Sequence, residues 1–223
     1  MQQLSSAAAT AVPTHTYTQV KWMTCLMFFV FAMTTDAVGV IIPEVVKQFD
    51  LSLTQAAAFH YVPMIFIGLS GLFLGQLADQ LGRKKIILFG LLIYTLACFA
   101  FALGQSFYFY NLLLGLCGLS IGLFKTGALA LIGDISPNSA SHTRLMNRVE
   151  GFFGLGAIVG PALVAVLLMF DMAWEQLYFV AGFICAVLLL IAYRMDYPVY
   201  ARQPKASIWQ TLALVKNPYA LGF

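Results

Sequence analysis

The chain has 223 residues, of which 61% are hydrophobic and only 9% are charged, and its formal net charge is +3. A soluble domain of this size carries roughly 25% charged residues, because polar side chains must cover its surface. Together with a mean hydropathy of +0.86, this composition excludes a soluble cytosolic enzyme and predicts a polytopic membrane protein.

The first residues of the chain are polar or small, and the first basic residue is Lys21. A cleavable signal peptide needs a basic segment followed directly by a short apolar core, and that pattern is absent. We therefore predict a disordered cytoplasmic tail over residues 1–21 that leads into a retained first helix.

Six apolar segments follow the tail, each long enough to span a bilayer as a helix, which takes about 20 residues. They are apolar on all sides, whereas the strands of a membrane barrel alternate and are half as long. We predict an all-α bundle of six transmembrane helices over residues 22–194. In chain order the predicted spans are Trp22–Pro43, Ala56–Leu77, Ile86–Leu103, Phe107–Ile132, Leu145–Phe170 and Gln176–Tyr193.

The basic residues predict how the bundle is oriented, because cytoplasmic loops are enriched in Lys and Arg. If the N-terminus is cytoplasmic, ten basic residues lie on that side, only Lys47 lies on the other, and Lys125 lies inside a helix. Both termini are therefore predicted to be cytoplasmic, in a bacterial inner membrane. Residues 195–223 turn polar and then amphipathic, which predicts a cytoplasmic linker and the start of a seventh span, or else a plain cytoplasmic tail.

The connection between the second and third spans reads Gly-Gln-Leu-Ala-Asp-Gln-Leu-Gly-Arg-Lys-Lys, from Gly75 to Lys85. Glycines at both ends allow a tight turn. A carboxylate at Asp79 can pair with a cation or a helix N-terminus, and the planar guanidinium of Arg83 can bridge carboxylates. The alternative is an ordinary basic loop with turn glycines. We predict a conformational clasp, which opens when the bundle rocks, formed by Gly75, Asp79, Gly82, Arg83, Lys84, Lys85 and Asp134.

This run resembles the loop signature of the major facilitator superfamily and occupies the same topological place. The resemblance implies the N-terminal six-helix half of a major facilitator fold, built as a 3+3 inverted repeat. It also implies a secondary transporter that works by alternating access. Such proteins have two six-helix halves, and the sequence contains only the first.

A second resemblance is to the fucose–galactose–glucose proton symporter branch. It is carried by Thr35-Asp36 ahead of Ile42-Pro43, by Phe124–Ala128, by Ser141–Leu145 and by Gly156–Pro161. The chain departs from that branch at three positions. An acid usual in the fourth helix is replaced by Lys125, an expected asparagine by Leu129, and an expected glutamine by Glu150.

Two charged residues lie inside predicted spans, where a charge costs about 3 kcal/mol on insertion scales and is a functional candidate. Asp36 shares a helix face with Ala32, and Lys125 shares one with Gly118 and Gly122. Small residues mark contacts between membrane helices, so both charges are predicted to point into the bundle. The alternatives are a structural polar contact for Asp36 and a lysine that extends toward the cytoplasm.

Glycines recur along three of the spans, and close packing between helices is their predicted role. They are Gly68, Gly71 and Gly75, then Gly115, Gly118 and Gly122, then Gly151, Gly154, Gly156 and Gly160.

These residues suggest a transport site. Asp36 is predicted to carry the coupling proton, and Lys125, Glu150 and Asn147 to bind the substrate. Counted from the expected helix ends, Lys125 and Glu150 lie roughly 12 Å and 9 Å deep, so we expect an ion pair within about 4 Å.

The sequence contains no metal-binding, phosphate-binding or nucleophile motif, so we predict no cofactor, no enzymatic activity and no nucleic-acid partner.

The predicted partners are a small solute, protons, the lipid bilayer, and a missing C-terminal half or a second copy. The favoured function is proton-coupled uptake of a sugar or other small polar solute. The alternatives are a proton-coupled drug or metabolite exporter, and a non-transporting half that serves only in assembly.

Overall fold

The structure is a computed structural model that describes residues 14–197. Within this range the side chains of residues 14–17, 75, 76, 78 and 79 are not described. Most of the predicted tail, and the predicted linker from residue 198 onward, lie outside the described residues.

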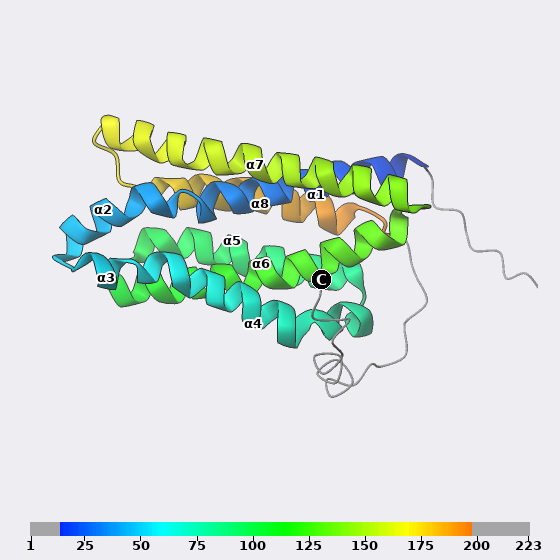
Figure 1. The fold of residues 1–223 in the computed structure, drawn as a ribbon, viewed down its shortest axis with the longest axis horizontal. Coiled ribbons are helices and arrows are strands. Elements are labelled where there is room, and N and C mark those ends of the chain that lie inside the picture. Colours follow the sequence, from blue (N-terminus) through cyan, green and yellow to red (C-terminus); the bar gives the residue numbers. More distant parts are fainter. Residues whose placement is uncertain (1–13, 198–223) are drawn as a thin grey trace, which may run out of the picture.

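The described chain is helical, and Figure 1 labels its helices in chain order. Six stretches are long and apolar enough to cross a membrane, which confirms the six predicted spans. The helices are α1 (Thr14–Thr35), α2 (Val38–Phe49), α3 (Leu53–Ala56), α4 (Ala58–Leu81), α5 (Arg83–Ala100), α6 (Phe107–Ile135), α7 (Ser139–Met169) and α8 (Gln176–Arg194), with a 3₁₀ turn at Phe101–Leu103.

The first span differs from the prediction at its start, in its middle and at its end, where α2 continues past Pro43 to Phe49. It begins at Thr14, so the last part of the predicted tail is helical, and it is broken between α1 and α2 at Asp36. The hydroxyl of Thr35 shares its hydrogen between two acceptors, Asp36 Oδ2 at 3.1 Å and the carbonyl oxygen of Phe31 at 3.0 Å. Such local side-chain bonds compete with regular helix geometry, which explains a break at this point.

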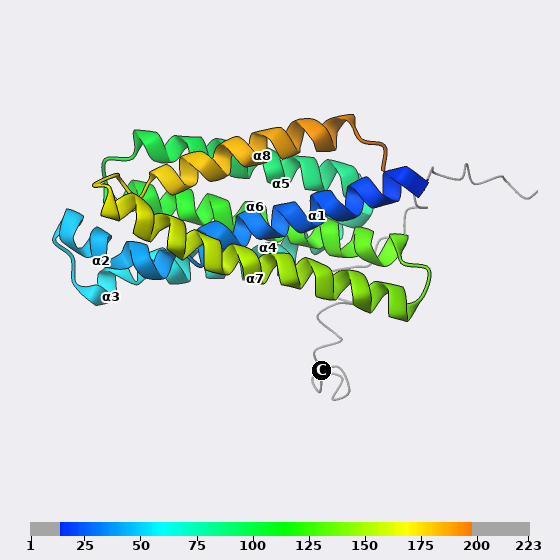
Figure 2. The ribbon, with the colours of Figure 1, turned by 90° about the horizontal axis from the view of Figure 1, so that it is seen from above.

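The six spans form two layers of three, with α1, α7 and α8 in one layer and α4, α5 and α6 in the other (Figures 1 and 2). Helix α1 packs mainly on α7, α6 packs on α4 and α5, and α5 joins α8. The first three spans are α1 with α2, α4 and α5, and the last three are α6, α7 and α8. The first span packs on the fifth (α1 on α7), and the fourth packs on the second (α6 on α4). This is the symmetry that an inverted repeat of three helices requires.

Close glycine contacts hold α7 against α1. A Cβ atom added at Gly156 would collide with the carbonyl oxygen of Phe29, and one added at Gly160 would collide with that of Met33. The two helices therefore run parallel along this contact, and a step of four residues on α7 matches a step of four residues on α1. Small residues allow membrane helices to approach this closely, so the packing role predicted for these two glycines is confirmed.

Helix α6 contacts α4 in the same way, with Gly118 against the backbone of Pro63 and Gly122 against Ser70. The Ser70 hydroxyl also donates to the carbonyl of Leu119 over 3.0 Å. Four other glycines make no close contact of this kind, because no other part of the described chain lies within 4 Å of an added Cβ. They are Gly68 and Gly71 on α4 and Gly151 and Gly154 on α7.

An aromatic cluster fills the centre of the bundle between the two layers. The ring of Phe31 lies 4.7 Å from that of Tyr94 and 4.9 Å from that of Phe124, measured between centroids. The Tyr94 hydroxyl shares a hydrogen bond with Thr34, so α1 is fixed to α5 by a polar contact inside an apolar core.

Candidate functional site

Helices α4 and α7 are the least buried of the six spans, and they pack chiefly on α6 and α1. They lie together along one edge of the bundle in Figure 2, whereas α5 and α8 lie along the opposite edge. The predicted substrate residues belong to α6 and α7, and Asp36 lies at the α1–α2 junction.

Lys125 of α6 places its ammonium group between aromatic rings of two other helices. Its Nζ lies 5.5 Å from the ring centroid of Phe28 on α1 and 4.8 Å from that of Phe153 on α7. Cations within about 6 Å of a ring are attracted to its face. The cation thus links three helices within the membrane-spanning region.

The ion pair expected between Lys125 and Glu150 is not formed, because the described residues contain no N–O contact within 4 Å between them. The two residues do share a level, ten residues before the end of α6 and eleven after the start of α7. The two side chains point in different directions. The lysine ends over Phe153, three residues beyond Glu150 on α7, while Glu150 itself is exposed.

Asp36 is exposed in the described chain, so the prediction that it points into the bundle is wrong. The buried residue is Ala32, one turn earlier, whose Cβ lies 3.0 Å from a Cβ added at Gly156. Asp36 lies eight residues beyond Phe28, or about 12 Å along the helix axis from the ring that contacts Lys125. Its carboxylate accepts a hydrogen bond from the Thr35 hydroxyl and is exposed in the described chain.

Asn147 is exposed on α7, one helical turn before Glu150. The structure therefore brings Lys125, Glu150 and Asn147 to one level of the bundle and leaves Asp36 at a different depth.

The predicted clasp contains an ion pair between helix ends. The Nε of Arg83, at the start of α5, donates to Oδ2 of Asp134, near the end of α6, over 3.0 Å. The side chains are only 17% and 23% exposed, so solvent screens the pair less than a surface pair.

The next lysine connects the same end of α5 to α8. The Nζ of Lys84 donates to the carbonyl of Met195 over 2.6 Å and lies 5.6 Å from the ring of Tyr197. Burial raises the pKa of the Tyr197 hydroxyl, which is a neutral donor to the sulfur of Met23 at 3.7 Å.

The turn between α4 and α5 consists of Gly82 alone, with φ at +91° and ψ at 149°. This backbone region is essentially restricted to glycine. Helix α4 continues through Gly75 and Asp79, so the turn predicted at Gly75 is wrong. The surroundings of Gly75 and the side chain of Asp79 lie outside the described part. Lys85 makes no ion pair within residues 14–197 and lines a groove on α5 and α8 instead.

The sequence did not identify Phe28 or Phe153 as contacts of Lys125. Apolar side chains are so frequent in these spans that neither ring stands out, although Phe153 follows Glu150 by three residues.

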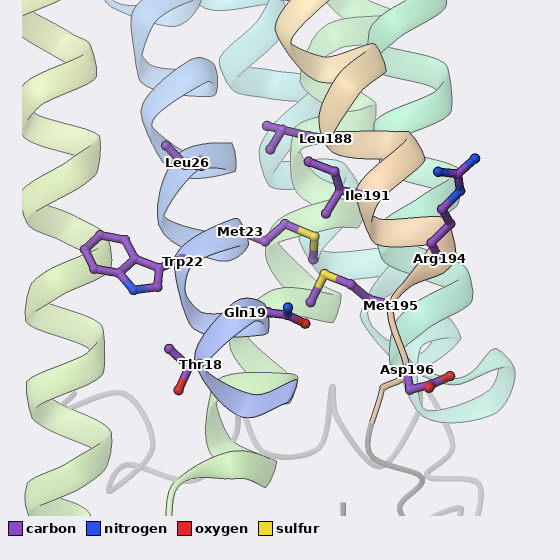
Figure 3. Close-up of a pocket in the computed structure, with 10 residues that line it drawn as sticks. All are labelled: Thr18, Gln19, Trp22, Met23, Leu26, Leu188, Ile191, Arg194, Met195 and Asp196. Carbon is purple, nitrogen blue, oxygen red and sulfur yellow. The ribbon is translucent and has the colours of Figure 1, made fainter. Parts of the chain in front are cut away.

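A separate cavity of about 600 Å³ lies between α1 and α8 (Figure 3). It contains none of the predicted site residues. Its lining residues are Thr18, Gln19, Trp22, Met23, Leu26, Leu188, Ile191, Arg194, Met195 and Asp196.

Comparison with known proteins links this arrangement to transport. The profile of the Major Facilitator Superfamily matches residues 24–223. The chain is 33% identical over 147 residues to the quinolone resistance protein NorA of Staphylococcus aureus, covering 62% of the chain and 36% of NorA. It is 31% identical over 163 residues to the niacin transporter NiaP of Acinetobacter baylyi, covering 72% of the chain and 36% of NiaP. The chain thus spans about a third of the length of these curated relatives.

The fold is also similar to a solved structure, a bacterial homologue of the human lysosomal transporter Spinster in an inward-facing, unoccupied conformation. The TM-score is 0.67 at 15% sequence identity, and the match covers 88% of this chain and 47% of that one.

Proposed function

Because the chain belongs to the Major Facilitator Superfamily, we propose that it is part of a proton-coupled transporter that takes up a small polar solute, with sugars among the candidates. The family and the relatives are transporters rather than enzymes, and the six membrane-length helices make the chain an integral multi-pass membrane protein. Alternating access would move the solute past a site near the middle of the bilayer.

The single observation that carries the proposal is the position of Lys125. Its ammonium lies inside a membrane span, over two aromatic rings from other helices. An ammonium in this region is costly and marks a substrate or ion pathway by default. In our proposal Lys125, Glu150 and Asn147 bind the polar groups of the solute.

Asp36 has the role of proton carrier in this proposal. Its carboxylate is exposed at a helix break and accepts a hydrogen bond from Thr35, which suits a group that takes up and releases a proton. The Arg83–Asp134 pair, with Asp79 and the neighbouring lysines, acts as the clasp that closes and opens with each cycle. This face is cytoplasmic in our proposal, in a bacterial inner membrane, and a C-terminal half or a second copy completes the pathway along α4 and α7.

The proposal is tested with the protein in vesicles that contain a pH-sensitive dye. Under an imposed inward proton gradient, glucose, galactose, fucose and niacin are added in turn, and internal pH and solute content are followed. At least one solute should accumulate with protons, and Lys125→Met should abolish the effect. The control is Lys47→Met, which removes a lysine from an exposed pair with Glu44 and should leave transport unchanged. Equal transport by the two variants would contradict the proposal.

A second candidate is proton-driven export of a lipophilic drug, which is favoured by the 33% identity to NorA. It predicts that a quinolone is expelled from inverted vesicles or cells under a proton gradient while no sugar moves. The direction of quinolone and sugar movement therefore separates the two candidates.

A further inference from the structure

A groove between α5 and α8 lies on the edge of the bundle opposite α4 and α7 (Figure 2). It has a volume of about 470 Å³. Its floor is apolar, formed by Leu88, Phe89 and Leu92 of α5 with Leu189 and Leu190 of α8. Phe89 is 54% exposed and Leu190 is 62% exposed, so this surface is open along the membrane-spanning region. In an integral membrane protein such a surface faces lipid.

One end of this groove is polar and basic. Lys85, in the first turn of α5, and Tyr193, in the last turn of α8, line that end. The bond from Lys84 to the carbonyl of Met195 holds the start of α5 beside the end of α8, so both side chains lie at one level.

Arg194 adds a second cation beside the groove. It follows Leu190 by four residues and therefore lies on the same face of α8. Arg194 also lines the cavity between α1 and α8, but Figure 3 shows its side chain directed away from α1. Within residues 14–197 neither Lys85 nor Arg194 forms an ion pair, and Asp196 does not come within ion-pair distance of Arg194.

We infer that the α5–α8 groove is a binding site for one anionic phospholipid, whose acyl chain lies in the groove and whose phosphate contacts Lys85 and Arg194. The charge of the two cations is complementary to a phosphodiester, and the Tyr193 hydroxyl can donate to a phosphate or glycerol oxygen. Basic pockets between membrane helices bind anionic headgroups for this reason. The site goes beyond the proposed transport function and does not depend on which solute is carried.

The lipid is identified by two features together. A free phosphate would use the cations but gain nothing from the apolar floor, whereas a neutral lipid would use the floor but not the cations. Each basic residue near an anionic surface is worth about 1 kcal/mol, or roughly a fivefold change in affinity. Removal of both cations should therefore weaken binding by on the order of twentyfold.

The test uses the delipidated chain in detergent, titrated with dioleoylphosphatidylglycerol or with dioleoylphosphatidylcholine, which has the same acyl chains but a zwitterionic headgroup. Bound lipid is counted by native mass spectrometry. The wild-type chain should bind one phosphatidylglycerol in preference to phosphatidylcholine. The double variant Lys85→Gln/Arg194→Gln should lose this preference, and the swapped variant Lys85→Arg/Arg194→Lys should keep it.

Two further variants control for charge and for shape. Arg144→Gln removes an exposed cation from α7 and should change binding less than twofold. Leu92→Trp fills the groove without changing the charge and should prevent binding. The inference is overturned if the double variant binds phosphatidylglycerol as Arg144→Gln does, if phosphatidylcholine binds equally well, or if Leu92→Trp has no effect. Because the readout is binding, failure of the transport proposal leaves the result interpretable.

Discussion

The contact between α7 and α1 predicts opposite effects for two glycine-to-alanine substitutions on one helix. In Gly160→Ala the new methyl group would meet the backbone carbonyl of Met33, which cannot move without shifting α1. Overpacking costs about 1–3 kcal/mol of stability, and because the neighbour is backbone we expect a cost of about 3 kcal/mol for Gly160→Ala. Alanine regains about 1 kcal/mol of helix propensity, which leaves a net loss of about 2 kcal/mol.

The matched control is Gly154→Ala, because no other part of the described chain lies within 4 Å of its added methyl group. Only the gain in helix propensity applies there, so this variant should be as stable as the parent or more stable. In a chain of this size 1 kcal/mol corresponds to about 2–4 °C in melting temperature. We expect Gly160→Ala to melt about 4–8 °C lower in detergent, measured by intrinsic fluorescence. Equal melting temperatures for the two variants would refute the close contact between α7 and α1.

Three other predictions concern the clasp and the proton site. Replacing Gly82, whose φ is +91°, by alanine should cost about 1–3 kcal/mol of stability, and an unchanged melting temperature would show that the one-residue turn is relaxed. Arg83→Gln and Asp134→Asn should each slow transport with little change in solute affinity, and a double-mutant cycle on stability should give a coupling of about 1–3 kcal/mol. Additive effects would mean that the pair contributes nothing. Asp36→Asn should abolish accumulation under a proton gradient while leaving solute exchange partly intact, and accumulation by this variant in sealed vesicles would exclude Asp36 as the proton carrier.

The number and order of the spans could be predicted from the sequence, because a run of about 20 apolar residues can hardly be accommodated except as a membrane helix. Their ends could not be predicted in the same way. The predicted polar connection from residue 78 to 85 is largely helical, since a single glycine with positive φ suffices to turn the chain. Helical spacing alone does not reveal such a turn.

The depth of the candidate site residues along their helices could be predicted, but the direction in which their side chains point could not. Counting residues along helices places Lys125 and Glu150 at one level because the helical rise is constant. Which way a long side chain turns depends on its neighbours, and the ammonium group lies over the rings of Phe28 and Phe153 without an ion pair to Glu150. The open faces at Gly68 and Gly154 could not be predicted for a related reason, since glycine spacing indicates a face that allows close packing without showing what covers it.

The central claim is that solute and protons move together through the site around Lys125. The most direct test is to measure both fluxes at once in the same vesicles, with a labelled solute identified in the transport screen and an internal pH dye. The account predicts a fixed ratio of protons to solute, uphill accumulation that disappears when the proton gradient is collapsed, and loss of both fluxes in Lys125→Met. Solute that only equilibrates, with no accompanying proton movement, would contradict it.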